Sequence, residues 1–333
     1  MLMKNITVLT VLVIIVCTYS VNNSAYCAEN PIVENLDNLL QDNKAAAPLP
    51  HQYGFSLGTS LGFAYGQAVE LVYHDNTYNY KYLSELRWDI KPVFYLGLNL
   101  VFERKDIMIA PGFFSSLYFK AGLPADSGVI ENRDWLSDED DRLTHFSSHT
   151  NRTNEFFWLD ILAGVSIPVQ SMFYIKPFIS GSWMRFAFTG KDGYGIYPGS
   201  ERIFDGDVIH YEQNWLLLAA GIGIGSKLHS PFAFDLAFKI SPLTYCAARD
   251  RHLERDVTFL DYTGFGLYLE HSINMSLIID TFEISLGLSY TYIGDTRGPS
   301  YNDESRKDRF LPGGEAGAAL SVFTAQLIFK IEI

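Results

Sequence analysis

The chain has 333 residues, 48% of them hydrophobic and 15% aromatic, and its 38 acidic and 25 basic side chains give a formal net charge of −13 at pH 7. This negative balance argues against a nucleic-acid-binding protein, because such proteins neutralise phosphates with Lys and Arg; it suits a cationic partner or simply a well-solvated surface. A helical membrane protein is also excluded, since no segment beyond residue 27 reaches the roughly 20 apolar residues of a membrane-spanning helix.

The N-terminus has the pattern of a secretory signal peptide, which we expect to cover residues 1–27. A positive charge at Lys4 precedes a nearly unbroken apolar run at 6–17, and the small residues Ala25 and Cys27 suit a cleavage site. The apolar run is too short to cross a bilayer comfortably. A secreted chain that is rich in aromatic residues and lacks helical spans favours a transmembrane β-barrel.

A lipoprotein with an acylated Cys27 is the alternative for the N-terminus, and the bulky Tyr26 before the cysteine counts against it. Removal of residues 1–27 leaves Cys246 as the only cysteine. An intramolecular disulfide and a thiolate metal cluster are then both excluded.

Residues 28–52 are expected to form an N-terminal tail and linker without chemistry of their own, and long β segments begin at residue 53. The clearest segment is 282–292, where apolar side chains occupy every even position and small or polar ones every odd position. A period of two predicts a strand with one apolar face, and in a membrane barrel that face contacts lipid. A soluble β-sandwich would also alternate, but its strands are usually only about 5–6 residues long.

The same reasoning predicts ten strands over residues 53–333. They are expected at 53–73, 79–102, 107–123, 153–166, 171–190, 208–226, 232–247, 259–277, 281–295 and 314–333. Short connections alternate with longer ones at 74–78, 124–152, 191–207, 248–258 and 296–313, as periplasmic turns alternate with extracellular loops in outer-membrane barrels. The sequence therefore predicts an all-β, ten-stranded antiparallel transmembrane barrel that extends above the membrane.

Two polar segments in the longer connections are candidates for chemistry. Asp250 precedes His252 by two residues, so both side chains point to one side of an extended segment and the carboxylate can orient the imidazole as a general base. Asp134 lies in an acidic segment far upstream, and the barrel topology brings both segments to the extracellular side. Exposed loops often carry such residues without a catalytic role.

We expect no metal site. His145 and His149 are not part of a HExxH motif, and no carboxylate shares their spacing. The acidic run 138–141 lacks the alternating ligands and the glycine of a calcium-binding EF-hand loop. Trp88, Trp158 and two tyrosines near strand ends are expected in the aromatic girdles at the membrane interface.

Several short motifs follow one another in a fixed order along the predicted strands. They are Ser56-Leu57-Gly58-Thr59, Val69-Glu70-Leu71-Val72-Tyr73, Ser84-Glu85-Leu86-Arg87-Trp88, Asp134-Trp135, Asn154-Glu155-Phe156, Tyr211-Glu212-Gln213 and Asp250-Arg251-His252. In this order and spacing the chain resembles the omptin family of outer-membrane proteases from about residue 55 to the C-terminus. The resemblance implies a ten-stranded barrel in the outer membrane, with an active-site groove at its extracellular rim.

The resemblance also implies site residues. In omptins an Asp-x-His pair, here Asp250 and His252, faces the two acids of an Asp-x-Asp-Trp motif across the groove, and a water held between them attacks the peptide carbonyl without a metal or a covalent intermediate. Asp134 matches the second acid, but the first is Asn132, which can bind a water yet cannot accept its proton. A site that needs this carboxylate would be impaired or would depend on Glu131.

Substrate and lipid preferences are implied in the same way. Omptins cleave beside basic residues, and Glu70 matches one acid of the pocket for the residue before the scissile bond; the positions of two further acids hold Ala248 and His145. Omptins depend on lipopolysaccharide, and Arg185 fits one basic residue that binds it. The expected partners are peptide or protein substrates outside the cell and outer-membrane lipid, with no nucleic acid and no other cofactor.

Two other classes of function stay open. One is an omptin-like barrel that has lost proteolysis and acts as an adhesin or binding protein, which the residues Asn132, Ala248 and His145 favour. The other is a pore or structural barrel unrelated to proteolysis, although a ten-stranded lumen filled with side chains should conduct poorly.

Overall fold

The computed structural model describes residues 52–74, 82–105, 112–137, 142–170, 173–229, 231–303 and 311–333. The expected signal peptide, nearly all of the expected tail and the acidic run 138–141 lie outside these ranges. Among the described residues there is no helix that is long and apolar enough to cross a membrane.

The described residues form fourteen strands, which belong to one antiparallel sheet. They are β1 (Gln52–Tyr73), β2 (Tyr82–Lys105), β3 (Gly112–Gly122), β4 (Ala125–Asp134), β5 (His145–Gln170), β6 (Phe173–Tyr197), β7 (Ser200–His229), β8 (Phe232–Ser241), β9 (Thr244–His252), β10 (Val257–Gly264), β11 (Tyr268–Ile279), β12 (Phe282–Ile293), β13 (Gly298–Asn302) and β14 (Leu311–Glu332).

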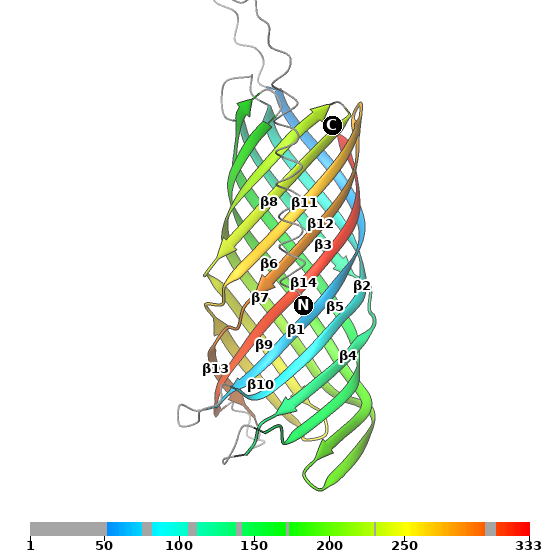
Figure 1. Ribbon diagram of the computed structural model, residues 1–333, viewed down its shortest axis with the longest axis vertical. Coiled ribbons are helices and arrows are strands. Elements are labelled where there is room, and N and C mark those ends of the chain that lie inside the picture. Colours follow the sequence, from blue (N-terminus) through cyan, green and yellow to red (C-terminus); the bar gives the residue numbers. More distant parts are fainter. Residues whose placement is uncertain are drawn as a thin grey trace, which may run out of the picture. The chain divides into compact units, whose positions relative to one another are not determined.

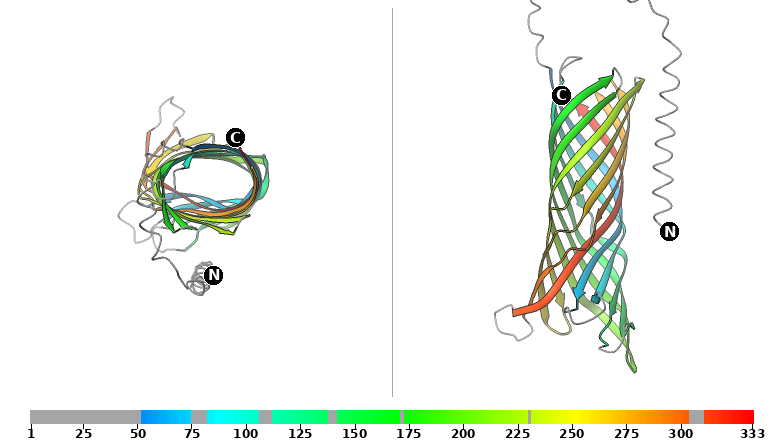
Figure 2. Two further views of the ribbon diagram at one scale, coloured as in Figure 1. Left: turned by 90° about the horizontal axis from the view of Figure 1, so that it is seen from above. Right: turned by 60° about the vertical axis from the view of Figure 1, so that its left-hand side comes forward.

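The sheet closes into a ring of ten positions (Figures 1 and 2). The long strands β1, β2, β5, β6, β7 and β14 each fill one position, and the pairs β3/β4, β8/β9, β10/β11 and β12/β13 share the other four, which we call the split positions. Closure comes from β1 and β14, which pair from Ser56 opposite Glu332 to Val72 opposite Ala316. The predicted ten-stranded antiparallel barrel is thereby confirmed.

Each split position is interrupted by two to four residues, at 123–124, 242–243, 265–267 and 294–297. Single backbone hydrogen bonds still connect these interruptions to their neighbours, such as the Leu123 amide to the Phe94 carbonyl and the Gly294 amide to the Leu267 carbonyl. The exposed apolar side chains Leu123, Leu243 and Leu267 lie at three of the four breaks. At the four split positions the ring is therefore divided into a main part and a rim, whereas the six long strands run through both.

The expected long connections were wrong in their secondary structure. Strand β4 and the start of β5 occupy much of 124–152, β6 and β7 continue through 191–207 to a tight turn, and β9 and β13 extend into 248–258 and 296–313. Beyond the membrane both faces of a strand contact water or polar groups, so the alternation that reveals a strand is lost. The backbone still needs hydrogen-bond partners, and pairing supplies them.

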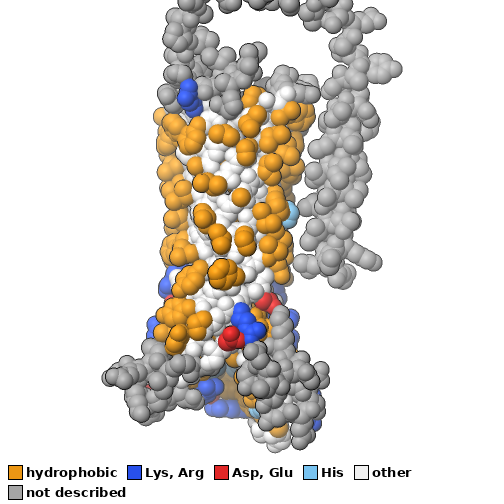
Figure 3. Space-filling view, turned by 90° about the vertical axis from the view of Figure 1, so that its left-hand side faces the viewer, with side chains coloured by type: hydrophobic (Ala, Val, Ile, Leu, Met, Phe, Trp, Pro, Cys, Tyr) orange, Lys and Arg blue, Asp and Glu red, His pale blue; other side chains and the backbone are white. Residues whose placement is uncertain are grey.

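The outer surface carries a broad apolar belt (Figure 3). Phe282, Ile284 and Leu286 are exposed on β12, as the alternating sequence predicts, whereas Glu283 between them points inward and binds Lys330 at 2.5 Å. Charged side chains in this view gather near the end of the barrel that carries β4, β9, β10 and β13. This distribution suits a barrel that spans a membrane and projects its rim into water.

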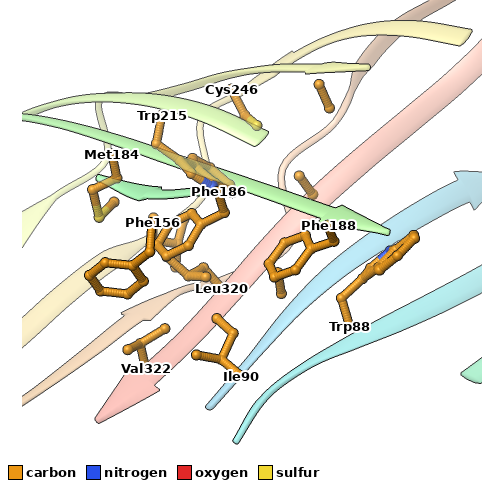
Figure 4. Packing of buried hydrophobic residues seen from close by; sticks show 14 of the residues in the cluster. Trp88, Ile90, Phe156, Met184, Phe186, Phe188, Trp215, Cys246, Leu320 and Val322 are labelled. Atoms are coloured by element: carbon orange, nitrogen blue, oxygen red, sulfur yellow. The ribbon is translucent and has the colours of Figure 1, made fainter. Parts of the chain in front are cut away.

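Large side chains fill the lumen below the rim (Figure 4). Trp88 stacks on Phe188 and Tyr211, with ring centroids 5.6 and 5.2 Å apart, and Trp215 is fully buried beside them. Trp88 and Trp158 were expected in a membrane girdle, but both are buried in the lumen because they share the inward face of their strands with other buried residues. This aromatic layer separates the rim from the lumen beneath it.

A buried ion-pair cluster lies below the aromatic layer. The Lys239 ammonium bonds to the carboxylates of Asp160 and Glu270, the latter at 3.0 Å, and all three side chains are buried. They line a lumen cavity of about 240 Å³ together with Lys120 and other polar side chains. Charges this far from water are tolerated because each has a partner.

Replacing Lys239 by Met should destabilise the barrel by about 3–5 kcal/mol, because it leaves two buried carboxylates without a counter-charge. Arg152→Met is the matched control: Arg152 lies 3.6 Å from Asp126 in an exposed pair, and its loss should cost less than about 1 kcal/mol. Urea unfolding in lipid vesicles measures both changes, and equal stabilities of the two variants would contradict the prediction.

Candidate active site

The Asp250/His252 pair lies at the end of β9, between β7 and β10. His252 Nε2 is 2.6 Å from Asp250 Oδ2; the Asp250 residue is 1% exposed and the His252 side chain 25%. The Phe259 ring packs edge-on against the imidazole, with centroids 5.7 Å apart. When Nε2–H donates to the buried carboxylate, Nδ1 carries the lone pair that can accept a proton.

The Asp134 segment forms the end of β4, next to β2. Ser84 lies opposite Asp134 in the β2–β4 pairing, and its hydroxyl donates to Asp134 Oδ1 at 2.6 Å. Asn132 donates its amide to Asp134 Oδ2 at 3.3 Å, and its carbonyl oxygen lies 3.2 Å from the Ser84 hydroxyl. The predicted residues Asn132 and Asp134 therefore form one hydrogen-bonded group with Ser84.

The two groups influence each other across the mouth of the barrel. Burial raises the pKa of Asp134, and the Ser84 hydrogen bond, His145 and His252 partly offset this rise. Strands β4 and β9 occupy well-separated positions in the ring, so the interaction crosses the lumen and does not run along one strand pair. The fold thus brings together the two segments that are 116 positions apart in the sequence, from Asp134 to Asp250.

A buried carboxylate lies on β1 beside these groups. Glu70 is 3% exposed, and its pKa is raised well above the usual value, mainly by burial and then by the charges of Asp250, Asp261 and Asp134. Asp261 on β10 is 2% exposed; burial raises its pKa to about 6, with a hydrogen bond to Ser300 opposing and Asp250 adding to the rise. The predicted Glu70 therefore belongs to a cluster of buried acids.

The other three predicted positions, Ala248, His145 and Arg185, do not belong to this cluster of buried acids. Ala248 is buried on β9, and His145 lies directly opposite Asp134 in the β4–β5 pairing. Arg185 points out of the barrel, between two inward-facing neighbours on β6. Its guanidinium bonds to Glu155 at 2.5 Å and to Glu212 at 3.2 Å.

Ser84 and Asp261 are two site residues that were not predicted. Ser84 begins the motif Ser84-Glu85-Leu86-Arg87-Trp88, but only the β2–β4 register puts it beside Asp134. Asp261 lies in a strand-like run of apolar and hydroxyl residues, 257–264, where a single acid on an otherwise uncharged segment was a usable signal. An isolated acid in a strand can also face water, so its burial could not be deduced from the sequence.

The arrangement can support proton transfer and water binding. A histidine with one nitrogen on a buried carboxylate can accept a proton at the other. The Asp134 carboxylate and the Asn132 carbonyl oxygen can accept hydrogen bonds from a water on the opposite wall. Buried acids that lack a cation can bind a positively charged group.

Comparisons with known proteins agree with this picture. The model of the Omptin family matches residues 51–331. The plasminogen activator of Yersinia pestis is 25% identical over 281 residues, which cover 79% of this chain and 84% of that protein. The crystal structure of the outer membrane protease OmpT from Escherichia coli superimposes with a TM-score of 0.72 at 16% identity, covering 84% of this chain and 97% of that chain.

The buried Asp261 should make stability depend on pH. Its folded-state pKa of about 6 exceeds the ordinary value of 3.8. Its favourable contribution to the free energy of unfolding is therefore fully present below pH 3.8 and is lost as pH rises through 6. Asp261→Asn should then be more stable than the parent chain at pH 8, by up to about 3 kcal/mol.

Glu70 and Asp250 face Asp261 and are present in both proteins, so the difference between variant and parent reports the Asp261 contribution. Equilibrium urea unfolding in lipid vesicles at pH 4 and pH 8 measures it. A difference that does not grow from pH 4 to pH 8 would show that Asp261 is not a destabilising buried acid.

Proposed function

Because the chain belongs to the Omptin family, we propose that it is an outer-membrane endopeptidase that hydrolyses peptide bonds at the rim of its barrel. The rim with β4, β9, β10 and β13 faces the outside of the cell, and the apolar belt lies in the outer membrane. The substrates are peptides or proteins outside the cell. The observation that carries the proposal is the Asp250–His252 pair opposite the hydrogen-bonded Asn132, Asp134 and Ser84 group.

In the proposed mechanism His252 is the general base and Asp250 orients it. A water bound by Asp134 and Asn132 gives a proton to His252 Nδ1 as its oxygen attacks the peptide carbonyl carbon. The buried Asp250 carboxylate stabilises the resulting imidazolium. His252 then returns the proton to the departing amine nitrogen as the peptide C–N bond breaks, which leaves a new carboxylate and a new amine.

Asn132 changes the usual acid pair into one carboxylate and one amide. Its amide nitrogen donates to Asp134, so its carbonyl oxygen is the atom turned to a water or to Ser84. Glu131 is an unsuitable substitute, because it is bonded to Arg133 and neighbouring residues of a strand point to opposite faces. We therefore assign the water-binding carboxylate to Asp134 alone.

We further propose that the enzyme prefers a basic residue beside the scissile bond and that lipopolysaccharide supports its activity. The buried Glu70 supports the first preference, since a carboxylate in a low-dielectric site attracts Arg or Lys. Arg185 on the outer face suits a lipid phosphate, but Glu155 and Glu212 already accept from its guanidinium. The Arg185 contribution to lipid binding should therefore be small.

A binding barrel without proteolysis is the second candidate. Asn132 and Ala248 favour it, because each removes a carboxylate that omptins use. A pore is the third, and the aromatic layer of Trp88, Phe188 and Tyr211 across the lumen counts against it. Incubation of the purified protein with a diverse peptide library, with and without lipopolysaccharide, separates the first candidate from the other two.

Replacing His252 by Ala should lower kcat/KM for arginine-containing peptides by about 10²–10⁴-fold, the usual contribution of a general base. The barrel should stay folded, since His252 is partly exposed at the rim. Peptide hydrolysis measures the first outcome, and resistance of the barrel to trypsin the second. Undiminished cleavage by a folded variant would refute the assignment of His252.

Replacing Asn132 by Asp should raise kcat/KM by about 10-fold or more, because it adds a second carboxylate that can take part in proton transfer. Asn154→Asp is a control that adds the same charge on β5, where Asn154 binds Thr189. If the two variants change hydrolysis equally, the gain would reflect net charge and not the water site.

A further inference from the structure

We propose that Asp261 and Glu70 form the acidic floor of a pocket that takes the cationic side chain of the substrate, so that Asp261 is a specificity-determining residue. The inference rests on the proposed peptidase function and adds a residue to it. Asp261 belongs to none of the motifs that suggested the site.

Each carboxylate of this pocket has one oxygen that lacks a hydrogen-bond donor in the described part of the chain. Glu70 Oε2, Asp250 Oδ1 and Asp261 Oδ1 are buried, and each has no partner among the described residues. Asp250 is different from the other two because it is committed to His252, whereas Glu70 and Asp261 make their further hydrogen bonds to Asp250 and Ser300. Glu70 and Asp261 are thus the acids that remain available for a ligand.

The polar groups around the pocket are already paired with one another. Gln213 donates to the Val69 carbonyl and to the Tyr211 hydroxyl, both at 2.9 Å, and accepts from Trp215 at 3.0 Å. None of these bonds reaches a carboxylate of the floor. Among the described residues no donor reaches Glu70 Oε2 or Asp261 Oδ1, so a bound molecule can supply one.

The charges that act most strongly on the two carboxylates are those of other acids. The charges that act on Glu70 are those of Asp250, Asp261 and Asp134, and the charge that acts on Asp261 is that of Asp250. Burying several acids together without a cation is costly. A folded protein that keeps this cluster is preorganised for a ligand that brings positive charge.

An organic cation fits the cluster better than a metal ion. Among the described residues no three His, Cys, Asp or Glu side chains are arranged to hold a metal. A guanidinium presents five N–H donors in a planar fork and can bond to two carboxylates at once, which a compact ammonium does less well. We therefore expect arginine to be preferred over lysine.

The strand pairing explains how Asp261 reaches the pocket. Asp261 lies directly opposite Ala248 in the β9–β10 pairing, and opposite residues of an antiparallel pair share one face with Cβ atoms about 4.5–5.5 Å apart. The Ala248 methyl group leaves room for the Asp261 side chain. A carboxylate at either position would therefore enter the same space from neighbouring strands.

Three matched probes test the proposal. Two peptides differ only before the scissile bond, where one has arginine and the other its neutral analogue citrulline. The third probe, p-aminobenzamidine, is a fluorescent cation whose binding does not require cleavage. Asp256→Asn is the control variant, because it removes one exposed carboxylate from the same β9–β10 hairpin.

Asp261→Asn should lower the arginine-to-citrulline ratio of kcat/KM by about 10–100-fold, the loss expected for hydrogen bonds to a charged group. Hydrolysis of the citrulline peptide should be nearly unchanged, and p-aminobenzamidine should bind correspondingly more weakly. Asp256→Asn should behave like the parent chain. Adding Ala248→Asp to the Asp261→Asn variant should restore both the ratio and the affinity.

The outcomes separate the pocket from the peptidase. If the parent chain cleaves no peptide but binds p-aminobenzamidine through Asp261, the proposed function fails and the pocket stands. If Asp261→Asn matches Asp256→Asn in both assays, or if Ala248→Asp restores neither the ratio nor the affinity, the assignment of Asp261 is overturned. The Asp261→Asn variant should fold, because the loss of a buried charge should stabilise the barrel.

Discussion

The pairing of β1 with β14 is the constraint on which the rest of the molecule depends. In lipid no water can satisfy the backbone groups of a sheet edge, so an open sheet of this kind could not cross a membrane. The two strands pair over nearly their whole length, and their closure fixes the ring of ten positions. Only in a closed ring do β4 and β9 end on opposite walls of one mouth. The site is thus a product of closure, and no single hairpin contains it.

The interior of the ring changes character along its axis. The lower lumen holds paired charges around Lys239, the middle is closed by aromatic rings, and the rim holds acids and a histidine. The aromatic layer places stacked, buried rings next to the acids of the rim. The local dielectric is therefore low, which strengthens the interaction of Asp250 with His252 and makes the unpaired Glu70 costly. The aromatic layer therefore fills the lumen by packing and also lowers the dielectric around the acids of the rim.

The membrane part of the fold could be predicted almost completely, but the rim could not. Apolar and polar residues alternate over 282–292 because one strand face contacts lipid and the other faces the lumen. This difference between the two faces exists only in the membrane-spanning part of a strand. Above the belt the contrast vanishes, so β4 and β13 looked like loops. Trp88 was misplaced because its residue type suits both a girdle and a packed lumen. His252 and Asp250 were found from their spacing within one strand, whereas Asp261 depends on the register between two strands, which one sequence does not reveal.

The four split positions allow the rim to change without changing the membrane-embedded part of the barrel. Where a strand runs unbroken from belt to rim, as β1 does, an insertion at the rim would shift its register through the membrane. At a split position the interruption can absorb an added or lost residue, because only a few single hydrogen bonds cross it. Strands β4, β9, β10 and β13 all lie above such interruptions. The walls that carry Asp134, Asp250 and Asp261 can therefore be remodelled in length and composition while the membrane-embedded cylinder keeps its shear.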